Sequence, residues 1–390
     1  MNKYPTVLVH GFLGTGADNG FYKIFRYFGS FTGDLTKELR KRGYEVYQPS
    51  LGPFNGLWTR CCELYAYLVG GTVDYGKAHS ETWHHERYGR TYPGVLKDWG
   101  QPGDHAKLNL IGHSFGGPTV CLYSSLLEQG SEAERAATPA EELSPLFKGG
   151  QGGLLHTVTT IDGTNNGTTV TDFLGKTGRN AAAAVIYGLG VMYNSTKGVK
   201  FYDFMNEHYH LMADPQKEIP GKFVNPLKKQ REIKNLVDGE ENIMWQMSTE
   251  FSRDYARRNY TTIPTAYYFV RRGSKTHDGI LGAGTPNRNI NPIFLVTAPI
   301  ISLYRSKRLG IDDSWAKNDG VVPVCGMNAP DGQPAEDYEY GTVIRPGVWF
   351  NMPVEDGKDH ENFVGMFYNH KLLYQYFDDM LRKYSELPDA

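Results

Sequence analysis

The protein chain contains 390 residues, which is long enough for one large domain or for two. Its hydrophobic content of 40% and charged content of 22% exclude an intrinsically disordered or fibrous chain. The 41 basic and 43 acidic residues give a net charge of -2, so no basic field predicts a nucleic-acid or acidic-membrane partner.

Cysteine content and hydropathy further narrow the class of protein. The apolar-richest stretch, 181–191, is interrupted by glycines and is far shorter than the ~20 residues of a membrane span, which predicts no transmembrane anchor. Met1 lies a few residues before the first strand-like run, so we expect no signal peptide in this sequence. Four cysteines are too few for a disulfide scaffold, and their redox state stays open: Cys61, Cys62, Cys121 and Cys325.

The first half of the chain alternates strand-like and helix-like patterns at short spacing. A strand, a helix and another strand in close succession are typical of a parallel sheet. We therefore predict an α/β fold with a mostly parallel central sheet and helices on both faces. The expected strands are 6–9, 45–48, 107–111 and 155–161, and the expected helices are 34–42, 57–68 and 118–127.

The pattern changes after residue 172. Between Asp172 and Ser252 the strand signal disappears and helical windows take over, which indicates a helical insertion on an α/β core. Strand patterns return at 265–270 and 293–303, and a final helix is expected from residue 361 or 362 to 384. Because the sequence has no internal repeat or long linker, we favour one elaborated domain over 1–390.

A serine motif lies between a predicted strand and a predicted helix. The sequence Gly-His-Ser-Phe-Gly at 112–116 matches the pattern Gly-x-Ser-x-Gly. A serine in such a strand-to-helix turn adopts a strained backbone that exposes its hydroxyl at the helix N-terminus. The motif in this context predicts that Ser114 is a catalytic nucleophile. The alternative is a glycine-rich turn with a buried serine.

A glycine-rich loop follows the first predicted strand, with the sequence Val-His-Gly-Phe-Leu-Gly at 9–14. In this architecture such a loop supplies one backbone amide for a developing oxyanion, and the residue after the nucleophile supplies the other. We assign these two amides to Phe12 and Phe115. His10 either braces the loop or has no role.

A serine nucleophile needs a base, and the base needs a carboxylate to orient it. The expected order along the chain is serine, acid, histidine. Of the histidines after Ser114, His360 lies in a polar loop before the last helix, whereas His370 falls inside that helix. Asp319 lies in a turn ahead of an apolar run and is the favoured acid.

Three other aspartates are candidates for the acid. Asp162 follows a different predicted strand and is a rival to Asp319. Asp312 and Asp313 lie close to Asp319, but helix capping is their favoured role.

Several segments of the sequence carry a family likeness. They are Val-Gly-Gly-Thr-Val-Asp-Tyr-Gly at 69–76, Gly-Arg-Thr-Tyr-Pro-Gly at 89–94, Ile-Gly-His-Ser-Phe-Gly-Gly at 111–117, Gly-Ile-Asp-Asp-Ser-Trp at 310–315, Asn-Asp-Gly at 318–320 and Asp-His at 359–360. These segments resemble the large secreted lipases of thermophilic bacilli and staphylococci, a group with related polyester-cleaving lipases. The likeness runs over nearly the whole chain and implies the α/β-hydrolase fold with a triad of Ser114, Asp319 and His360. It also implies oxyanion amides from Phe12 and Phe115 and a mobile lid at about 172–196.

The resemblance further implies a structural zinc in an extra lobe at 55–100, bound by two histidines and two aspartates. His79 and His85 match the histidines, but Thr59 and Gln246 stand at the aspartate positions. Two imidazoles are an incomplete site, because structural zinc takes four ligands. The alternative is a metal-free lobe. Residues that could complete the site are Glu81, His84 and Cys61.

The family's calcium ligands after the catalytic histidine correspond to Asn362 and Phe367 in this chain. Calcium needs oxygen donors with negative charge among them, so we expect no calcium at that position. The expected chemistry itself requires no cofactor.

These features predict a serine carboxylester hydrolase, and the resemblance implies a secreted triacylglycerol lipase that acts at a lipid–water interface. The alternatives are a carboxylesterase, phospholipase or polyester hydrolase with the same triad, and, from another class, a catalytically silent binding protein. Apolar side chains of the expected lid either contact lipid or form permanent core. They are Phe173, Leu174, Val185, Ile186, Tyr187, Leu189, Val191, Met192 and Tyr193.

Overall fold

The fold is that of a computed structural model, which describes residues 3–17, 19–194, 202–205, 207–209, 211, 226–280 and 282–390. Residues 195 and 196 of the expected lid, and the side chains of Met192 and Tyr193, lie outside this description. Among the described residues, no helix combines the length and the apolar character needed to cross a membrane.

A central sheet of seven strands forms the middle layer, in the order β10-β11-β7-β6-β5-β1-β2, and every neighbouring pair is parallel. The predicted parallel sheet is therefore confirmed. Its strands are β1 (Thr6–Val9), β2 (Val46–Tyr47), β5 (Leu108–His113), β6 (Leu155–Ile161), β7 (Tyr267–Ser274), β10 (Ala335–Asp337) and β11 (Trp349–Asp356). Two antiparallel pairs lie outside it: β3 (Gly71–Asp74) with β4 (Tyr88–Tyr92), and β8 (Thr276–Gly279) with β9 (Gly282–Pro286).

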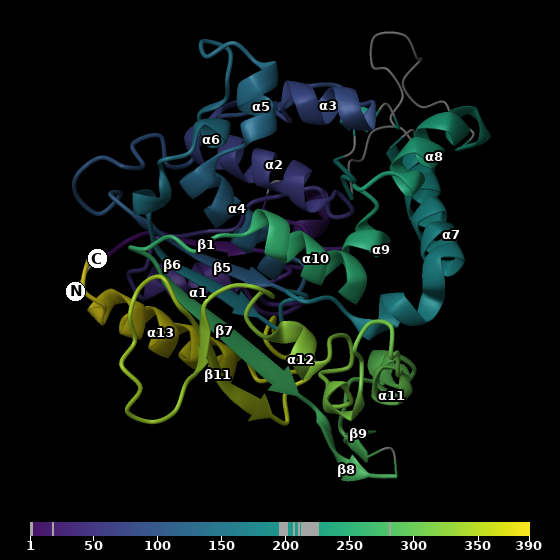
Figure 1. Ribbon diagram of the computed structural model, residues 1–390. Coiled ribbons are helices and arrows are strands. Elements are labelled where there is room, and N and C mark those ends of the chain that lie inside the picture. Colours follow the sequence, from purple (N-terminus) through teal and green to yellow (C-terminus); the bar gives the residue numbers. More distant parts are fainter. Residues whose placement is uncertain are drawn as a thin grey trace.

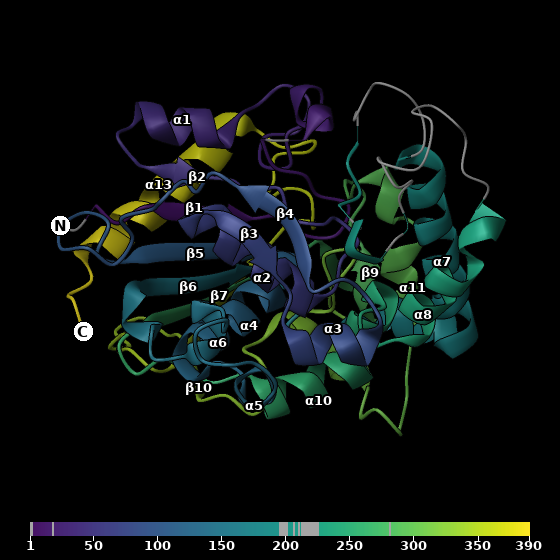
Figure 2. The ribbon, with the colours of Figure 1, turned by 90° about the horizontal axis from the view of Figure 1, so that it is seen from above.

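Helices cover both faces of the sheet, as Figures 1 and 2 show. Helices α1 and α13 lie on one face, and α2 and α4 lie on the other. The helices are α1 (Leu35–Lys41), α2 (Leu57–Val69), α3 (Lys77–Trp83), α4 (Gly116–Gln129), α5 (Glu132–Ala137), α6 (Pro145–Lys148), α7 (Thr169–Asn194), α8 (Gln230–Asp238), α9 (Ile243–Gln246), α10 (Thr249–Asn259), α11 (Thr297–Leu303), α12 (Val324–Met327) and α13 (His370–Glu386).

The two-residue period of the strands divides the core into two layers. In β1, Val7 and Val9 pack on the side of α2 and α4, whereas Leu8 packs on the side of α1 and α13. In β7, Val270 packs on the side of α2 and α4, and Phe269 packs on the side of α1 and α13. Strands β1, β5 and β6 are buried along their whole length, because helices cover both of their faces.

The helical segment predicted from Asp172 onward gathers at one end of the sheet. Helices α7, α8, α9 and α11 lie beyond the carboxyl ends of the strands, on the right in Figures 1 and 2, and both chain termini lie at the opposite end. No strand occurs between 172 and 252 in the part of the chain that the structure describes. The predicted division into a core, a lobe at 55–100 and an insertion at 172–252 stays a prediction.

Two predicted elements were wrong. The apolar run 293–303 is not a strand: Pro292–Phe294 forms a short 3-10 helix and Thr297–Leu303 forms α11, with Ala298, Ile301 and Ser302 buried at helical spacing. The final helix begins later than predicted, because the side chain of Asn369 caps it. His370 is therefore its first residue.

Candidate active site

Ser114 lies in a tight turn between β5 and α4. Its φ of 58° is in the left-handed region, which residues other than glycine seldom adopt. Packing explains the two flanking glycines: a β-carbon on Gly112 would lie 2.1 Å from the Gly116 carbonyl oxygen, and one on Gly116 would lie 2.3 Å from that of Val9. The Ser114 amide donates to the Ile161 carbonyl oxygen at 3.0 Å. The turn has the strained geometry that the motif predicts.

The loop after β1 runs beside this serine. A β-carbon on Gly11 would lie 2.6 Å from the β-carbon of Ser114. Neither the Phe12 amide nor the Phe115 amide donates a hydrogen bond to another described residue, which leaves both N–H groups for a ligand. Phe115 is also the N-cap residue of α4, so the positive end of the helix dipole adds to its amide.

Buried side chains brace that loop. His10 donates from Nδ1 to the Gly11 carbonyl oxygen at 2.9 Å and accepts at Nε2 from the Leu51 amide at 3.1 Å. Burial, followed by the charge of Arg60, lowers the pKa of His10 to about 3, so its ring is neutral. The buried Arg60 donates to the His10 carbonyl oxygen and to the Thr119 hydroxyl. The bracing role of His10 is confirmed, and sequence reasoning missed Arg60.

Asp319 is fully buried in a turn between α11 and α12. Its Oδ1 accepts from the amides of Val321 at 2.8 Å and Val322 at 2.7 Å. Its Oδ2 lies 2.6 Å from Nδ1 of His360, and the His360 amide donates to its carbonyl oxygen at 3.0 Å. The fold thus joins the predicted acid to the predicted base.

His360 lies in the loop between β11 and α13. An ionised carboxylate only accepts hydrogen bonds, so Nδ1 carries the hydrogen and Nε2 presents a lone pair. Burial by itself lowers the pKa of His360, but the charge of Asp319 and the hydrogen bond to it prevail and raise the pKa above 6.5. Among the described residues, the hydrogen bonds of His360 do not include one to the Ser114 hydroxyl. Such contacts often tighten only when substrate binds.

A second imidazole joins the turn of the serine to the predicted base. The ring of His113 lies against that of His360, with 4.7 Å between their centroids. His113 donates from Nε2 to the His360 carbonyl oxygen at 3.0 Å and accepts at Nδ1 from the Tyr27 hydroxyl at 2.8 Å. Burial, followed by the charge of His360, lowers the pKa of His113 well below its usual value. His113 was visible in the motif, but nothing in the sequence indicated its partners.

The other candidates for acid and base lie outside this cluster, except Asp162. Asp312 caps a short 3-10 helix by accepting from the Ser314 amide at 3.0 Å, which confirms its capping role. Asp313 is exposed. His370 contacts the Gly365 carbonyl oxygen instead of the site. Asp162 is buried beside Asp319.

Comparison with known proteins assigns the chain to a family. A family model described as "Lipase-like, C-terminal domain" matches residues 2–387. The chain belongs to this lipase-like family. Lipase 2 of Staphylococcus aureus is 34% identical over 373 residues, which are 94% of this chain and 51% of that protein. The lipase of Staphylococcus epidermidis is 32% identical over 366 residues, 93% of this chain and 50% of that protein. The lipase-like chain therefore spans about half the length of these curated relatives.

Solved structures of similar sequence show the same fold. The Staphylococcus hyicus lipase superimposes with a TM-score of 0.85 at 30% identity, covering 98% of this chain and 96% of that one. EstA from Clostridium botulinum superimposes with a TM-score of 0.81 at 33% identity, covering 100% of this chain and 88% of that one. Lipase 1 from Pelosinus fermentans gives 0.78 at 32% identity and covers both chains completely. The predicted α/β-hydrolase fold and the resemblance to staphylococcal-type lipases are confirmed.

The histidines expected to bind zinc in this lipase-like chain contact each other directly. His79 Nδ1 lies 3.0 Å from His85 Nε2. On the other side of the same ring, His79 Nε2 lies 3.4 Å from the carboxylate of the buried Glu241. Because the two contacts are on opposite sides of the His79 ring, the three side chains do not converge on one point.

The two residues at the aspartate positions are bound to protein groups. The Thr59 hydroxyl donates to Glu241 at 2.9 Å, and the Gln246 side chain accepts from the Leu57 amide at 2.8 Å. Burial favours the neutral form of Glu241, but the hydrogen bond and charge of His79 prevail and lower its pKa. These residues do not fit a four-ligand zinc site. Instead, contacts of Glu241 with Thr59 and His79 link distant parts of the chain.

A lysine supplies positive charge beside Asn362, one of the expected calcium positions. Lys275 Nζ lies 2.9 Å from the Asp359 carboxylate and 3.0 Å from the Asn362 side-chain oxygen. All three side chains are buried, whereas Phe367 is exposed and has no oxygen in its side chain. The residues present do not fit a calcium site, because the lysine already neutralises the aspartate next to His360.

Metal chelation is expected to change the Tm by no more than about 1 °C, since contacts between protein side chains take the place of both expected metal sites. The measurement is a thermal melt with and without EDTA. A chain with Thr59→Asp and Gln246→Asp restores the two missing carboxylates and should melt at higher temperature when zinc is added, which shows that the assay detects a bound metal. A fall of several degrees in the unmodified protein would contradict this account.

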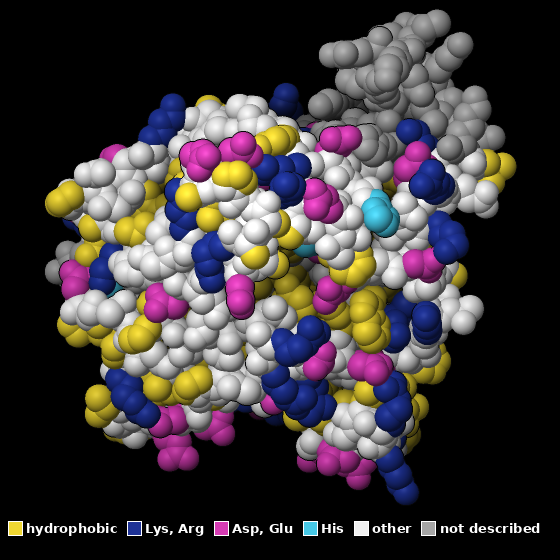
Figure 3. Space-filling model, turned by 45° about the horizontal axis from the view of Figure 1, so that its top comes forward, with side chains coloured by type: hydrophobic (Ala, Val, Ile, Leu, Met, Phe, Trp, Pro, Cys, Tyr) yellow, Lys and Arg dark blue, Asp and Glu magenta, His cyan; other side chains and the backbone are white. Residues whose placement is uncertain are grey.

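A polar groove on the surface does not include the candidate catalytic residues. On the face drawn in Figure 3, basic and acidic side chains gather around a hollow, in agreement with a groove of about 1480 Å³ between α7, α8 and α10. Ser114, Asp319 and His360 are not among the residues that line it.

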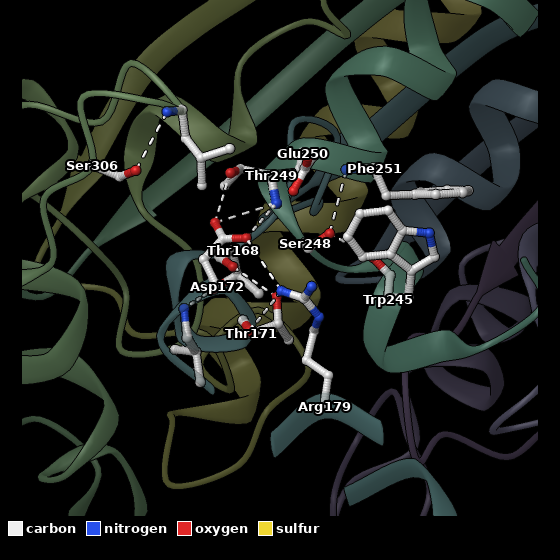
Figure 4. Close-up of polar contacts among 12 residues, drawn as sticks. Thr168, Thr171, Asp172, Arg179, Trp245, Ser248, Thr249, Glu250, Phe251 and Ser306 are labelled. Carbon is white, nitrogen blue, oxygen red and sulfur yellow. Dashed lines mark hydrogen bonds and ion pairs between the residues drawn. The ribbon is translucent and has the colours of Figure 1, made fainter. Parts of the chain in front are cut away.

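Asp172 ties the start of α7 to the start of α10 in the wall of this groove (Figure 4). Its carboxylate accepts from the Thr249 hydroxyl at 2.6 Å and from the Thr249 amide at 3.2 Å. Burial raises the pKa of Asp172 to about 6, although the Thr249 hydrogen bonds oppose the shift. Beyond a kink at Gly175, where φ is 61°, Arg179 stacks over Trp245 at 4.8 Å. Asp172 thus holds the start of α7 on α10, and the part of α7 beyond the kink contacts Trp245 of α9.

Proposed function

We propose that the protein is a serine carboxylester hydrolase, with triacylglycerols as its favoured substrates. The observation that carries the proposal is the 2.6 Å contact between Asp319 and His360, next to the strained turn that holds Ser114. A binding protein gains nothing from a buried charge-assisted pair beside a strained serine, whereas a catalytic triad requires all three groups. Membership of a lipase-like family supports the same class.

In the proposed reaction, His360 Nε2 removes the hydroxyl proton of Ser114 while the serine oxygen attacks the ester carbonyl carbon. Asp319 keeps the hydrogen on Nδ1 and stabilises the imidazolium that forms. His360 then gives the proton to the departing alcohol, and the serine keeps the acyl group. A water molecule activated by the same imidazole releases the carboxylic acid and restores the serine.

Two amides stabilise the negative charge that develops on the substrate oxygen. Phe115 contributes one from the start of α4, and Phe12 contributes the other from the loop that His10 and Arg60 brace. Removing one such donor typically costs about 3 kcal/mol of barrier. The buried bracing residues matter because these amides must be fixed before the charge appears.

The pH dependence of kcat/KM is expected to show one acidic limb with its midpoint above 6.5. His360 acts as a base only when neutral, and Asp319 raises its pKa, so the inactive protonated form persists to higher pH. The measurement is kcat/KM for a soluble aryl ester from pH 5 to 9. His105→Gln is the control, because it removes a surface imidazole that is also paired with carboxylates. It should leave the midpoint of the acidic limb unchanged. A midpoint below 6.5 would contradict the assignment of His360.

The exposed apolar side chains of helix α7 favour a lid that opens at a lipid surface. The inner face of the helix buries Tyr187 and Val191, whereas Val185 is 62% exposed and Leu189 is 51% exposed on the outer face. Neighbouring α11 exposes Leu303 as well, so apolar side chains from two helices border the carboxyl end of the sheet. Contact with lipid removes such surface from water. The kink at Gly175 is the proposed hinge.

The lid is tested by activity on a short ester below and above its solubility limit. A jump in rate above the limit is expected, and the jump should shrink in a chain with Val185→Ser and Leu189→Ser. Val343→Ser is the matched control, because Val343 is 77% exposed in a loop far along the chain from α7. A smooth saturation curve, with no gain on emulsions, would remove the lid from the proposal.

Substrate class and location are the finer parts of the proposal. Rates on tributyrin, triolein and a soluble aryl ester separate a lipase from an esterase, provided that Ser114→Ala abolishes all three. Rates on a phospholipid and on a polyester test the two alternatives, a phospholipase and a polyester hydrolase, in the same way. If triolein emulsions are not hydrolysed faster than the soluble ester is, the substrate is a small ester. From the resemblance to secreted lipases we also infer that the protein acts outside the cell.

A further inference from the structure

Asp162 is a fully buried carboxyl group for which the proposed reaction gives no role. It directly follows β6, and the preceding Ile161 carbonyl oxygen accepts from the Ser114 amide. Its φ of 45° is left-handed and therefore strained for an aspartate. A strained and buried acid at the base of the serine turn is costly, which indicates a function.

The contacts of Asp162 are few. Its Oδ1 accepts from the Gly273 amide at 2.6 Å. Its Oδ2 is buried and has no hydrogen-bond partner among the donor groups of the described residues. One side-chain ligand atom each of Asp162, His113 and His360 lie within 4.8 Å of one another. The Asp319 carboxyl adjoins the same group of side chains, because its Oδ2 lies 2.6 Å from Nδ1 of His360. Asp162 therefore borders the triad without belonging to it.

Two adjacent buried carboxyl groups cannot both be ionised at low cost. Asp319 already receives three donors, from the Val321 and Val322 amides and from His360, whereas Asp162 receives one. The negative charge therefore resides on Asp319. Burial, followed by the charge of Asp319, raises the pKa of Asp162 well above its usual range.

We propose that Asp162 is a positioning residue that keeps its proton and donates it in a hydrogen bond to the Asp319 carboxylate. Asp319 then has four donors for its four lone-pair sites, which fixes the plane of the carboxylate against His360. The unpartnered Oδ2 of Asp162 is explained, because it is the oxygen that carries the proton. This inference rests on the proposed roles of Ser114, Asp319 and His360.

The test uses Asp162→Asn, because a neutral carboxylic acid and an amide have the same shape and the same donors and acceptors here. The asparagine oxygen can accept from Gly273 while its nitrogen donates to Asp319. We expect kcat/KM within about threefold of the unmodified protein and an unchanged acidic limb. If Asp162 were ionised, this substitution would remove a negative charge near His360 and shift the limb to lower pH, which would overturn the proposal.

Asp162→Leu removes the donor and is expected to lower kcat/KM by about 10- to 100-fold. It should also shift the acidic limb to higher pH, because Asp319 then keeps more of its charge for His360. Unchanged activity and an unchanged limb in this variant would contradict the positioning role. The infrared difference spectrum between the unmodified protein and Asp162→Asn gives a readout that does not need activity. The spectrum should show that one protonated carboxyl band of the unmodified protein is lost in the variant at neutral pH. If no such band is lost, the proposal is overturned.

Failure of this inference is distinguishable from failure of the proposed function. If Asp162→Asn abolishes activity while Asp319→Asn retains it, Asp162 is the acid of the triad and the positioning role is wrong, but Ser114 and His360 keep their roles. If Ser114→Ala retains full activity, the proposed function itself fails.

Discussion

Replacing Ser114 by alanine is expected to lower kcat/KM for a soluble ester by roughly 10⁴- to 10⁶-fold, with little change in the Tm. Alanine removes the only atom that forms the acyl-enzyme, so acceleration remains only from substrate binding and from the two amides of the oxyanion site. The substitution deletes one oxygen from a 7% exposed side chain and keeps the backbone of the turn. The measurement is the initial rate on an aryl ester, together with a thermal melt of each protein.

The matched control is Ser385→Ala, which removes an exposed hydroxyl from the surface helix α13. It should leave kcat/KM within about twofold. Activity of Ser114→Ala above about one percent of the unmodified protein would mean that another group performs the attack.

Replacing Asp319 by asparagine is expected to lower kcat/KM by about 10⁴-fold while the fold is retained. The amide has the shape of the carboxylate, and its oxygen can still accept from the amides of Val321 and Val322. Its nitrogen then faces His360 Nδ1 and donates to it. The hydrogen of the imidazole moves to Nε2, where His360 can no longer accept the serine proton.

Asp312→Asn is the control for this prediction, because Asp312 is a nearby aspartate that only caps a turn. We expect it to keep kcat/KM within about twofold and to lower the Tm slightly. A mild loss in Asp319→Asn, comparable with that of the control, would show that another carboxyl orients His360.

Sequence reasoning led to the candidate residues of the site because each one follows a recognisable strand or loop. Ser114 lies in a motif whose context is local, and the parallel strands bring their carboxyl ends to one edge of the sheet, where the loops with Asp319 and His360 also lie. The order along the chain then favoured one acid and one base. The structure adds the 2.6 Å contact that joins these two residues.

Local patterns were misleading where an apolar run has no clear period. The segment 293–303 contains β-branched residues typical of strands, but it also contains Pro299 and follows Pro292. Proline removes a hydrogen bond from a central strand, whereas the first turn of a helix tolerates it. Pro299 does lie in the first turn of α11, so the prolines were the signal that favoured a helix.

The pairs that the sequence could not predict join distant residues of unremarkable type. Glu241 contacts Thr59 and His79 from 182 and 162 residues away along the chain, and nothing in its surroundings resembles a motif. From the sequence, Asp162 is only a rival to Asp319, because a sequence cannot show that two acids are buried beside the same imidazole. Contacts of this kind depend on how the loops pack, which is a property of the whole fold.

Labelling with a serine-directed phosphonate tests the central claim most directly. The reagent forms a covalent bond only with a serine whose proton a nearby base can remove, beside donors that stabilise the phosphonyl oxygen. We expect one equivalent of adduct, found on Ser114 by peptide mass analysis, and labelling at least about 10³-fold slower in His360→Ala. No adduct, or an adduct on another residue at the same rate in both proteins, would contradict the account.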